Sequence, residues 1–175
     1  MCYFMDTPWD AGFSSHSLRR INRVGLRRAT CRDQLVLFEI HRTAFLPHIA
    51  RIWGWDERQQ RASFLEEVAT TNTWVVETDS GIAGYLQVKS QAGRLYVRNM
   101  ALLPEFQRRG IGTWLVQKLQ TKAAARGMPI ELSVLRTNVP ARRFYERLGF
   151  VRTRDAQAHF ELTWHAPSVS NRLDC

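Results

Sequence analysis

The sequence predicts a mixed α/β fold of the α+β kind, in which a single domain carries one twisted, mixed, mostly antiparallel sheet of about six to seven strands flanked by about four helices. Two observations predict it. In the first half, strand-like segments are joined by the turn signals Asp79-Ser80-Gly81 and Gln91-Ala92-Gly93, which indicate antiparallel hairpins. In the second half, a strand, a helix and another strand follow one another, which indicates a crossover between parallel strands. A chain of 175 residues is long enough for one full core and short for two.

The first half supplies a strand, two helices and two hairpins. Residues 1–22 lack periodicity and are interpreted as a loose N-terminal extension, and RVGLRRA (23–29) as a first strand. Thr30 and Asp33 have the spacing of a capping box, which predicts a helix over 31–45. Pro47 is expected to end that helix and to open a second one over 47–68. Strands are expected over 73–78, 82–88 and 94–103, around the two turns.

The second half alternates helices and strands. A helix from about Gly110 to Arg126 is followed by the stop signals Gly127 and Pro129. IELSVL (130–135) has the composition of a buried strand. Asn138 is a good N-cap for a helix with Pro140 in its first turn. HFELTW (159–164) alternates like a last strand, so the domain is expected to span 23–165 and to leave 166–175 as a C-terminal tail.

Composition indicates an ordinary globular protein, since 45% of the residues are hydrophobic and 23% are charged. No apolar run approaches the roughly 20 residues of a membrane helix, so we expect no membrane partner. The start, MCYFMDTPWD, lacks the regions of a secretory signal. Cys2, Cys31 and Cys175 are scattered and odd in number, which argues against a disulfide framework and favours a cytoplasmic location. The five histidines form no ligand motif, so no metal is expected.

The chain is strongly basic, with a formal net charge of +9 and a pI near 10.3. Arginines concentrate in residues 19–28, 108–126 and 136–154. Such an excess attracts anionic partners, whether phosphate groups or nucleic acid. A solvated basic surface is an equally good interpretation, because net charge informs about partners and not about fold.

The segment QRRGIG (107–112) stands between an expected strand and an expected helix. Gly110 and Gly112 allow the backbone to turn so that successive N–H groups converge, and the helix start adds its unpaired donors and positive dipole end. With Arg108 and Arg109 beside it, this loop suits a pyrophosphate. It is neither a Walker loop nor a full Rossmann fingerprint, and two glycines alone also fit a plain tight turn.

The surroundings of the loop make it more specific. Pro104-Glu105-Phe106 followed by Gln-x-x-Gly-x-Gly closely resembles the acetyl-CoA motif of the GNAT superfamily of N-acetyltransferases. LSVLRTNVPARRFYERLGF (132–150) resembles the strand, the Asn and the Tyr-Glu-x-x-Gly-Phe helix end that follow in that family. Both pieces have the right order and spacing, and the resemblance covers about residues 23–165. It implies one GNAT-like domain whose sheet splays in the middle.

The resemblance implies an enzyme that moves acetyl from acetyl-CoA to a primary amine by direct attack in a ternary complex. Tyr145 would give a proton to the departing CoA thiolate. Backbone groups of Met100, Ala101 and Leu102 would hold the pantetheine arm like an added strand. Asn138 would contact a pantetheine amide, although a pure helix cap is an equal alternative. The other implied cofactor residues are those of the pyrophosphate loop and a nearby arginine: Gln107, Arg108, Arg109, Gly110, Ile111, Gly112, Thr113 and Arg142.

The residues that match the family pattern do not identify a general base. Relatives that modify protein N-termini carry a glutamate where this chain has Ser133, whose hydroxyl has too high a pKa to serve as a base. Glu131 lies two residues earlier and on the same strand face, so it is a candidate. Glu77 is a comparable candidate on the acceptor side. We otherwise expect a base that acts through water, or an amine that is already partly neutral.

The acceptor is expected opposite the cofactor, beside the connection between the first two helices. Trp53, Trp55 and Asp56 could form an aromatic wall with one carboxylate, which suits a cationic amine, or they could pack the helix junction. Small amines, protein or peptide amines and aminoacyl-tRNA all remain candidates. His41, His48 and His159 are interpreted as structural histidines.

A rival interpretation is a catalytically silent binding module that applies its basic face to RNA or a ribosome. The loop glycines and Tyr145 weigh against it, because such a module has no need of them. The phosphates of CoA also account for several arginines, so nucleic acid is not the favoured partner. Either a monomer or a homodimer is compatible with the sequence.

Overall fold

The computed structural model of the protein describes residues 16–18 and 21–167. Within them lies one eight-stranded sheet with the strand order β1-β2-β3-β4-β5-β6-β8-β7. The strands are β1 (His16–Leu18), β2 (Ile21–Arg28), β3 (Asn72–Thr78), β4 (Gly81–Gln91), β5 (Arg94–Leu102), β6 (Ile130–Leu135), β7 (Val151–Asp155) and β8 (His159–Trp164). The helices are α1 (Gln34–Trp53), α2 (Glu57–Thr70), α3 (Ile111–Ala124) and α4 (Val139–Arg147), with short 3₁₀ turns at Cys31–Asp33 and Pro104–Phe106.

The expected architecture is confirmed: one mixed, mostly antiparallel sheet is flanked by four helices in the described part of the chain. Two short strands were not foreseen. β1 has three residues inside the expected N-terminal extension, whose first 15 residues lie outside the described part. All five residues of β7 are exposed, so this strand lacks the apolar alternation that reveals a half-buried strand. In the expected C-terminal tail, residues 168–175 also lie outside the described part.

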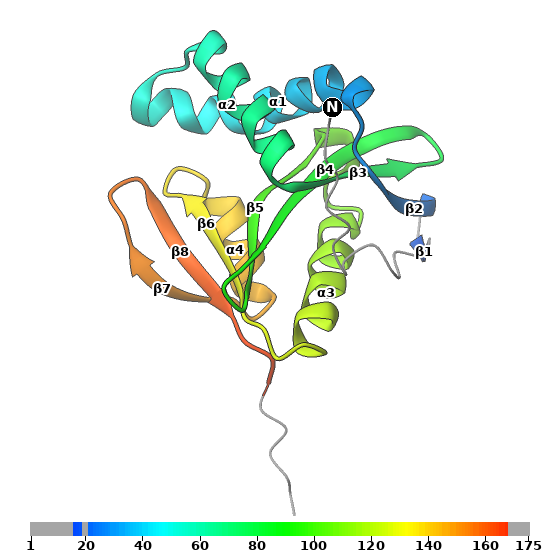
Figure 1. Cartoon of the computed structure of the whole chain (residues 1–175), viewed down its shortest axis with the longest axis vertical. Coiled ribbons are helices and arrows are strands. Elements are labelled where there is room, and N and C mark those ends of the chain that lie inside the picture. Colours follow the sequence, from blue (N-terminus) through cyan, green and yellow to red (C-terminus); the bar gives the residue numbers. More distant parts are fainter. Residues whose placement is uncertain (1–15, 19–20, 168–175) are drawn as a thin grey trace, which may run out of the picture.

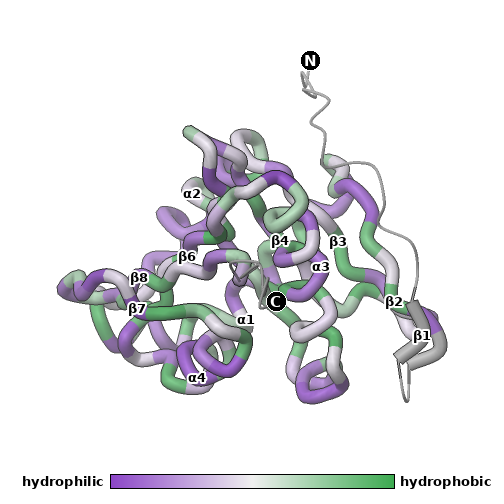
Figure 2. Tube along the Cα trace, turned by 90° about the horizontal axis from the view of Figure 1, so that it is seen from below, coloured by the Kyte–Doolittle hydropathy of each residue, from purple (hydrophilic) through white to green (hydrophobic). Residues whose placement is uncertain are grey.

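Helices cover the sheet on both faces (Figure 1). Alternation along the strands separates two cores, because Trp74 and Val76 face one side of β3 and Val75 faces the other. The larger core packs α3 and α4 against the sheet, and the smaller one packs α1 and α2. Hydrophobic stretches follow β3 and hydrophilic ones lie over α4 (Figure 2), as expected for a buried strand and a peripheral helix.

The expected break at Pro47 was wrong, because α1 runs through Pro47 to Trp53. The helix ends instead at Gly54, whose positive φ of 80° is a backbone conformation that favours glycine. Asp56 then caps α2 by accepting a hydrogen bond from the Gln59 N–H at 2.8 Å. The connection between the first two helices is therefore only Gly54–Trp55–Asp56, and α1 is long enough to reach across the domain.

The predicted capping box at the start of α1 is present. The Thr30 N–H donates to Asp33 Oδ2 at 2.7 Å. Arg27 on β2 donates to both Asp33 oxygens, at 2.7 and 2.8 Å, and to Glu77 on β3 at 2.7 Å. The Arg27 guanidinium holds the pKa of the buried Asp33 carboxyl well below its usual range, against the opposing effect of burial. This ion pair attaches the first turn of α1 to two strands.

The sheet divides between β5 and β6. These are parallel neighbours, but only Leu95, Tyr96 and Val97 pair with β6, opposite residues 130–132. Beyond them β5 continues to Leu102 on β4, and β6 continues to Leu135 on β8. The two halves of the sheet meet at the lower end of Figure 1 and separate toward α1 and α2.

A bulge on β5 lies where the strands separate. Val97 pairs with Val88 and Asn99 pairs with Gln87, so Arg98 is the extra residue. The Leu95 N–H donates to the Pro129 carbonyl at 2.9 Å. At the start of β5, the backbone N–H and C=O groups of odd-numbered residues therefore point toward β6. The extra residue reverses that alternation, so the backbones of Met100 and Leu102 face the gap between the strands.

Asp33→Asn should lower the free energy of unfolding by about 2 kcal/mol at neutral pH, because it weakens charge-assisted hydrogen bonds to Arg27. A carboxyl with a lowered pKa stabilises the fold above its unfolded pKa and loses that contribution as the pH falls. The difference between variant and wild type should therefore shrink below about pH 4. Urea denaturation of the variant and the wild type, at neutral pH and below about pH 4, measures this difference in unfolding free energy. Glu77→Gln is the matched control: its carboxylate shares Arg27 but is 43% exposed, so the loss should stay under about 1 kcal/mol. An Asp33→Asn loss that is independent of pH would contradict the account.

Gly84→Ala should destabilise the protein by about 3 kcal/mol, since a Cβ at residue 84 would collide with the Ala101 carbonyl oxygen and lie 2.8 Å from Leu102 Cδ2. The collision would push β5 away from β4. Gly25→Ala on β2 is the control, because its Cβ would meet nothing within 4 Å. Thermal unfolding of the two variants should differ clearly, and equal melting temperatures would refute the close approach.

Candidate functional site

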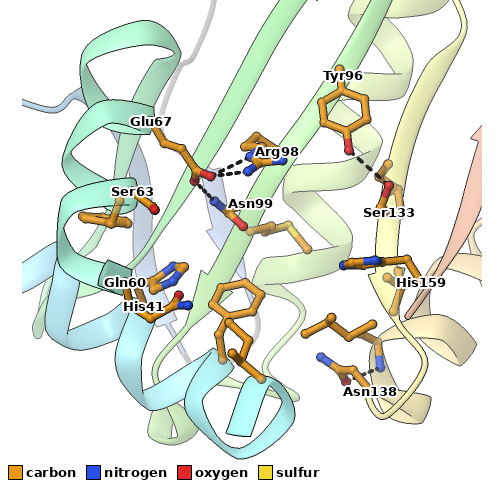
Figure 3. A pocket seen from close by; sticks show the side chains of 18 of the residues that line it. His41, Gln60, Ser63, Glu67, Tyr96, Arg98, Asn99, Ser133, Asn138 and His159 are labelled. Carbon is orange, nitrogen blue, oxygen red and sulfur yellow. Dashed lines mark hydrogen bonds and ion pairs between the residues drawn. The ribbon is translucent and has the colours of Figure 1, made fainter. Parts of the chain in front are cut away.

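A cavity of about 320 Å³ opens where β5 and β6 separate (Figure 3). Its walls come from α1, α2, β5, β6, α4 and the start of β8, so every helix except α3 contributes. The cavity therefore depends on the divergence of the two strands: a fully paired sheet would fill this space with a ladder of hydrogen bonds.

The β5 wall is polar. Arg98, Asn99 and Met100 all line the cavity although they are consecutive, which the bulge at Arg98 explains. Glu67 of α2 accepts hydrogen bonds from Arg98 through Oε1 and from Asn99 Nδ2 through Oε2 at 2.8 Å. Asn99 Nδ2 also donates to Oε1 of the fully buried Gln87 at 2.7 Å. This chain of hydrogen bonds fixes the bulge from the core outward and joins α2 to the sheet.

The opposite wall comes from β6 and α4. Tyr145 is 7% exposed, packs edge-on against Phe144 and Phe150, and lines the cavity. Burial raises the pKa of its hydroxyl, so Tyr145 keeps its proton at neutral pH. Asn138 caps α4 by accepting the Ala141 N–H at 3.1 Å, and it also lines the cavity, so its amide nitrogen remains for a ligand.

The C-terminal end of α1 crosses from one half of the sheet to the other (Figure 1). The His48 carbonyl accepts a hydrogen bond from Thr137 Oγ1 at 3.5 Å, in the connection between β6 and α4. Trp53, which is 59% exposed, packs against His159 at the start of β8 with ring centroids 5.6 Å apart. Helix α1 therefore covers one side of the cavity and limits access to it.

The expected pyrophosphate loop lies between β5 and α3. Arg108 has a φ of 57° and Gly110 a φ of 88°, so two residues of this short loop are left-handed. Gly110 is the N-cap of α3 and offers no side chain to the first-turn amides, which are free to receive an anion. Gly112 has another role: a Cβ there would lie 3.3 Å from the Phe144 ring, so this glycine lets α3 approach α4.

Several predicted cofactor residues face the gap. The Leu102 carbonyl accepts a hydrogen bond from Gln107 Nε2 at 2.9 Å, which attaches the loop to the end of β5. Ala101 is turned away, since its side chain is buried in the core under α1 and its backbone lies on the β4 side of the alternation. Arg142 stacks on Phe160 at 5.3 Å and pairs with Glu146, and its Nε is buried without a hydrogen-bond partner in the described part of the chain.

The acceptor-side predictions divide into two groups. Trp53 and Ser133 line the cavity, and Ser133 Oγ lies 3.1 Å from the Tyr96 hydroxyl. Four residues do not line it. Each of these has a local partner elsewhere: Trp55 with Glu57, Asp56 with the Gln59 N–H, Glu77 with Arg27 and Glu131 with Arg94.

Sequence reasoning missed most of the polar lining. Gln60, Ser63 and Glu67 come from the exposed-looking side of α2, and Tyr96 and Arg98 from β5. Strand alternation on β5 offered a signal for Tyr96 and Arg98, which are two residues apart and precede the reversal of the alternation. No comparable signal marked α2, since its position over the sheet follows from the length of α1.

The described helices include none that is both long and apolar enough to cross a membrane. Within the same residues, no three or more His, Cys, Asp and Glu side chains gather in a way that could hold a metal ion. Cys31 is free and exposed, and the other two cysteines lie outside the described part.

The sequence profile of the acetyltransferase (GNAT) family matches residues 36–150, well over half of the chain. The protein belongs to this family. It is therefore an acetyltransferase that acts with acetyl-CoA, as the resemblance of the loop implied. No curated protein is significantly similar to it in sequence.

Solved structures confirm the fold. PaiA N-acetyltransferase from Thermoplasma acidophilum, in complex with coenzyme A, superposes with a TM-score of 0.67 at 19% identity, over 81% of this chain and 98% of that one. The ribosomal-protein-S18-alanine N-acetyltransferase from Escherichia coli gives 0.61 at 17%, over 86% and 98%. NAA60 from Arabidopsis thaliana, in complex with a bisubstrate analogue, gives 0.60 at 17%, over 81% and 97%. At such identities the likeness shows the common fold.

Acetyl-CoA fits the residues present in two respects. Its pyrophosphate needs converging N–H donors, and the left-handed loop before α3 supplies them without a competing side-chain cap. Its pantetheine arm carries amides that need a strand edge, and the backbones of Met100 and Leu102 face the gap next to Tyr145.

Gly110→Glu should weaken acetyl-CoA binding at least 10-fold in calorimetric titration, because it places a carboxylate among the donors for the pyrophosphate. The left-handed φ also strains the loop. Gly93→Glu is the matched control: its φ is 75°, its surroundings are equally open, and it lies in the β4–β5 turn away from the cavity. If both variants bind like the wild type, the loop is not the pyrophosphate site.

Proposed function

We propose that the protein acetylates a primary amine by direct attack on acetyl-CoA in a ternary complex, with Tyr145 as the general acid. The buried Tyr145 hydroxyl at the cavity wall is the observation that carries this proposal. A phenol with a raised pKa is protonated when the thioester breaks, and it can give its proton to the departing thiolate.

The cofactor is assigned to the face of the gap that carries the loop. Backbone amides from Gln107 to Thr113, with Arg108 and Arg109, would hold the pyrophosphate. The backbones of Met100 and Leu102 and the side-chain amide of Asn138 would hold the pantetheine arm. Within the described residues, the buried Nε of Arg142 has no hydrogen-bond partner, and it would take a polar group of the cofactor. Acetyl-CoA supplies the activated acetyl group.

The acceptor is assigned to the part of the cavity between α2, β5 and β8. Trp53 offers an aromatic face, and Ser133 and the Tyr96 hydroxyl offer hydrogen bonds on the β6 and β5 walls. One of the structural neighbours, the Escherichia coli enzyme, is named for an alanine of ribosomal protein S18 as its acceptor. A protein or peptide amine and a small amine are therefore the first classes to test, with aminoacyl-tRNA as the third.

The first experiment combines calorimetric titration of acetyl-CoA with detection of released thiol. The acceptors would be spermidine, a peptide with an internal lysine, and a peptide with an N-terminal alanine. Binding of acetyl-CoA with thiol release that depends on one acceptor supports the proposal. A protein that fails to bind acetyl-CoA would sink it.

Tyr145→Phe should lower kcat about 100-fold or more while the affinity for acetyl-CoA stays unchanged, because only the proton donor is removed. The buried ring keeps its contacts with Phe144 and Phe150, so the variant should fold normally. Since the pKa of Tyr145 is raised, wild-type activity should persist to alkaline pH before it declines. A variant with full kcat would show that Tyr145 serves packing alone.

A further inference from the structure

The proposed reaction needs a group that takes a proton from the acceptor ammonium. The acidic and basic side chains that line the cavity, within the part of the chain that the structure describes, are His41, Glu67, Tyr96, Arg98, Tyr145 and His159. A base must be unprotonated near neutral pH, must have a free lone pair and must reach the cavity.

Two candidates are committed to hydrogen bonds that hold the fold. His41 is 7% exposed and its Nδ1 lies 2.8 Å from the Tyr85 hydroxyl. Burial lowers the pKa of His41 to about 4, which makes it a weak base. Both oxygens of Glu67 accept hydrogen bonds, one from Arg98 and the other from Asn99. This carboxylate holds the β5 bulge, and releasing it for proton transfer would break the network.

Three more candidates are unsuited to the role. Tyr145 is protonated because burial raises its pKa, and it already serves as the acid. The Tyr96 hydroxyl is engaged with Ser133 Oγ at 3.1 Å. Arg98 is a permanent cation, and its hydrogen bond to Glu67 raises its pKa further.

His159 meets all three requirements. It is the first residue of β8 and pairs with Leu135 at the open end of β6, where the two halves of the sheet are apart. Its ring points into the cavity in Figure 3, from the side opposite α2. No side chain in the described residues forms a hydrogen bond with its ring nitrogens. Trp53 packs against the ring and orients it.

We propose that His159 is the general base that takes a proton from the acceptor amine, directly or through one water molecule. This inference rests on the proposed function. The ammonium gives one proton to the imidazole, and the neutral nitrogen then attacks the acetyl carbonyl carbon. As the carbon–sulfur bond breaks, Tyr145 gives its proton to sulfur and recovers one from the amide nitrogen. The imidazolium releases its proton to solvent, which leaves the amide, free CoA thiol and one proton.

The charges around His159 favour its neutral form. Burial lowers its pKa most, Arg98 on β5 lowers it further, and Glu161 on β8 opposes them. Glu67 offsets part of the Arg98 charge, while Trp53, Ser133 and Asn138 on the other walls are uncharged. A histidine with a pKa below 6.5 is unprotonated at neutral pH. Activity that depends on it should therefore rise with pH through an inflection below 6.5 and then level off.

Two substitutions separate a base from a packing residue. His159→Gln removes both the base and the aromatic contact with Trp53, whereas His159→Phe keeps an aromatic ring and removes only the base. With an alkylamine acceptor, both variants should lose about 100-fold or more in kcat/KM, and the acidic inflection should disappear from both pH profiles. His165→Gln, at an exposed position just after β8, should behave like the wild type.

A neutral nucleophile provides the rescue. Methoxyamine is already unprotonated at neutral pH, so it needs no base to make its lone pair available. Both His159 variants should acetylate methoxyamine at nearly the wild-type rate while failing with the alkylamine spermidine. Tyr145→Phe should be impaired with both nucleophiles, because it acts on the leaving group.

The proton titration of the His159 ring by NMR, identified by its loss in His159→Gln, gives a test that needs no acceptor. A midpoint below about 7 leaves the ring unprotonated at neutral pH and agrees with the proposal, whereas a midpoint well above 7 would overturn it. Full spermidine activity in His159→Phe would also overturn it and leave the proposed function standing. Wild-type protein that binds acetyl-CoA but acetylates none of spermidine, methoxyamine and the two peptides would overturn the proposed function and this inference together.

Discussion

The architecture depends on one constraint, which is that β5 and β6 stop pairing after three residues. Backbone groups in the middle of a sheet normally satisfy one another, so a divergence there leaves polar groups that require another partner. The bulge at Arg98 decides which groups these are, by presenting Met100 and Leu102 to the gap. The hydrogen bonds from buried Gln87 through Asn99 to Glu67 hold that bulge in place. The early end of β5–β6 pairing, which contacts in the core maintain, thus creates a site for an extended molecule that carries amide groups.

The second determinant is the length of α1. Because the helix continues past Pro47, its last turns reach the other half of the sheet, where His48 meets Thr137 and Trp53 meets His159. The Arg27–Asp33 pair fixes the opposite end of the helix on β2. With α1 held at both ends, the gap becomes a walled cavity, and α2 is brought over β5 so that Glu67 can reach Arg98.

Local chemistry made much of this predictable. Some features depend on only a few neighbouring residues each, and these are present as expected. They are the turns at Gly81 and Gly93, the capping box at Thr30, the cap at Asn138 and the strand–loop–helix around Gly110. The failures concern features set by distant partners. Pro47 was expected to end a helix that tertiary packing continues. For Trp55 and Asp56 an acceptor wall and a helix junction were both open, and they lie at the junction between α1 and α2. Glu67 and His159 reach the cavity only through the folding of segments about 90 residues apart.

Pro47 has a consequence for how the cavity opens. Proline has no backbone N–H, so it cannot donate a hydrogen bond to the carbonyl one turn earlier in the helix. The series of backbone hydrogen bonds in α1 is therefore interrupted at Pro47, just before residues 48–53. Cooperativity along the helix is weakest at such a point, and the segment beyond it can unwind without melting the segment before it. Amide hydrogens after Pro47 should accordingly exchange with solvent faster than those of the buried turns around Leu37 and Ile40. Since that segment carries Trp53, which packs against His159 at the cavity, its local unwinding would widen the opening of the cavity.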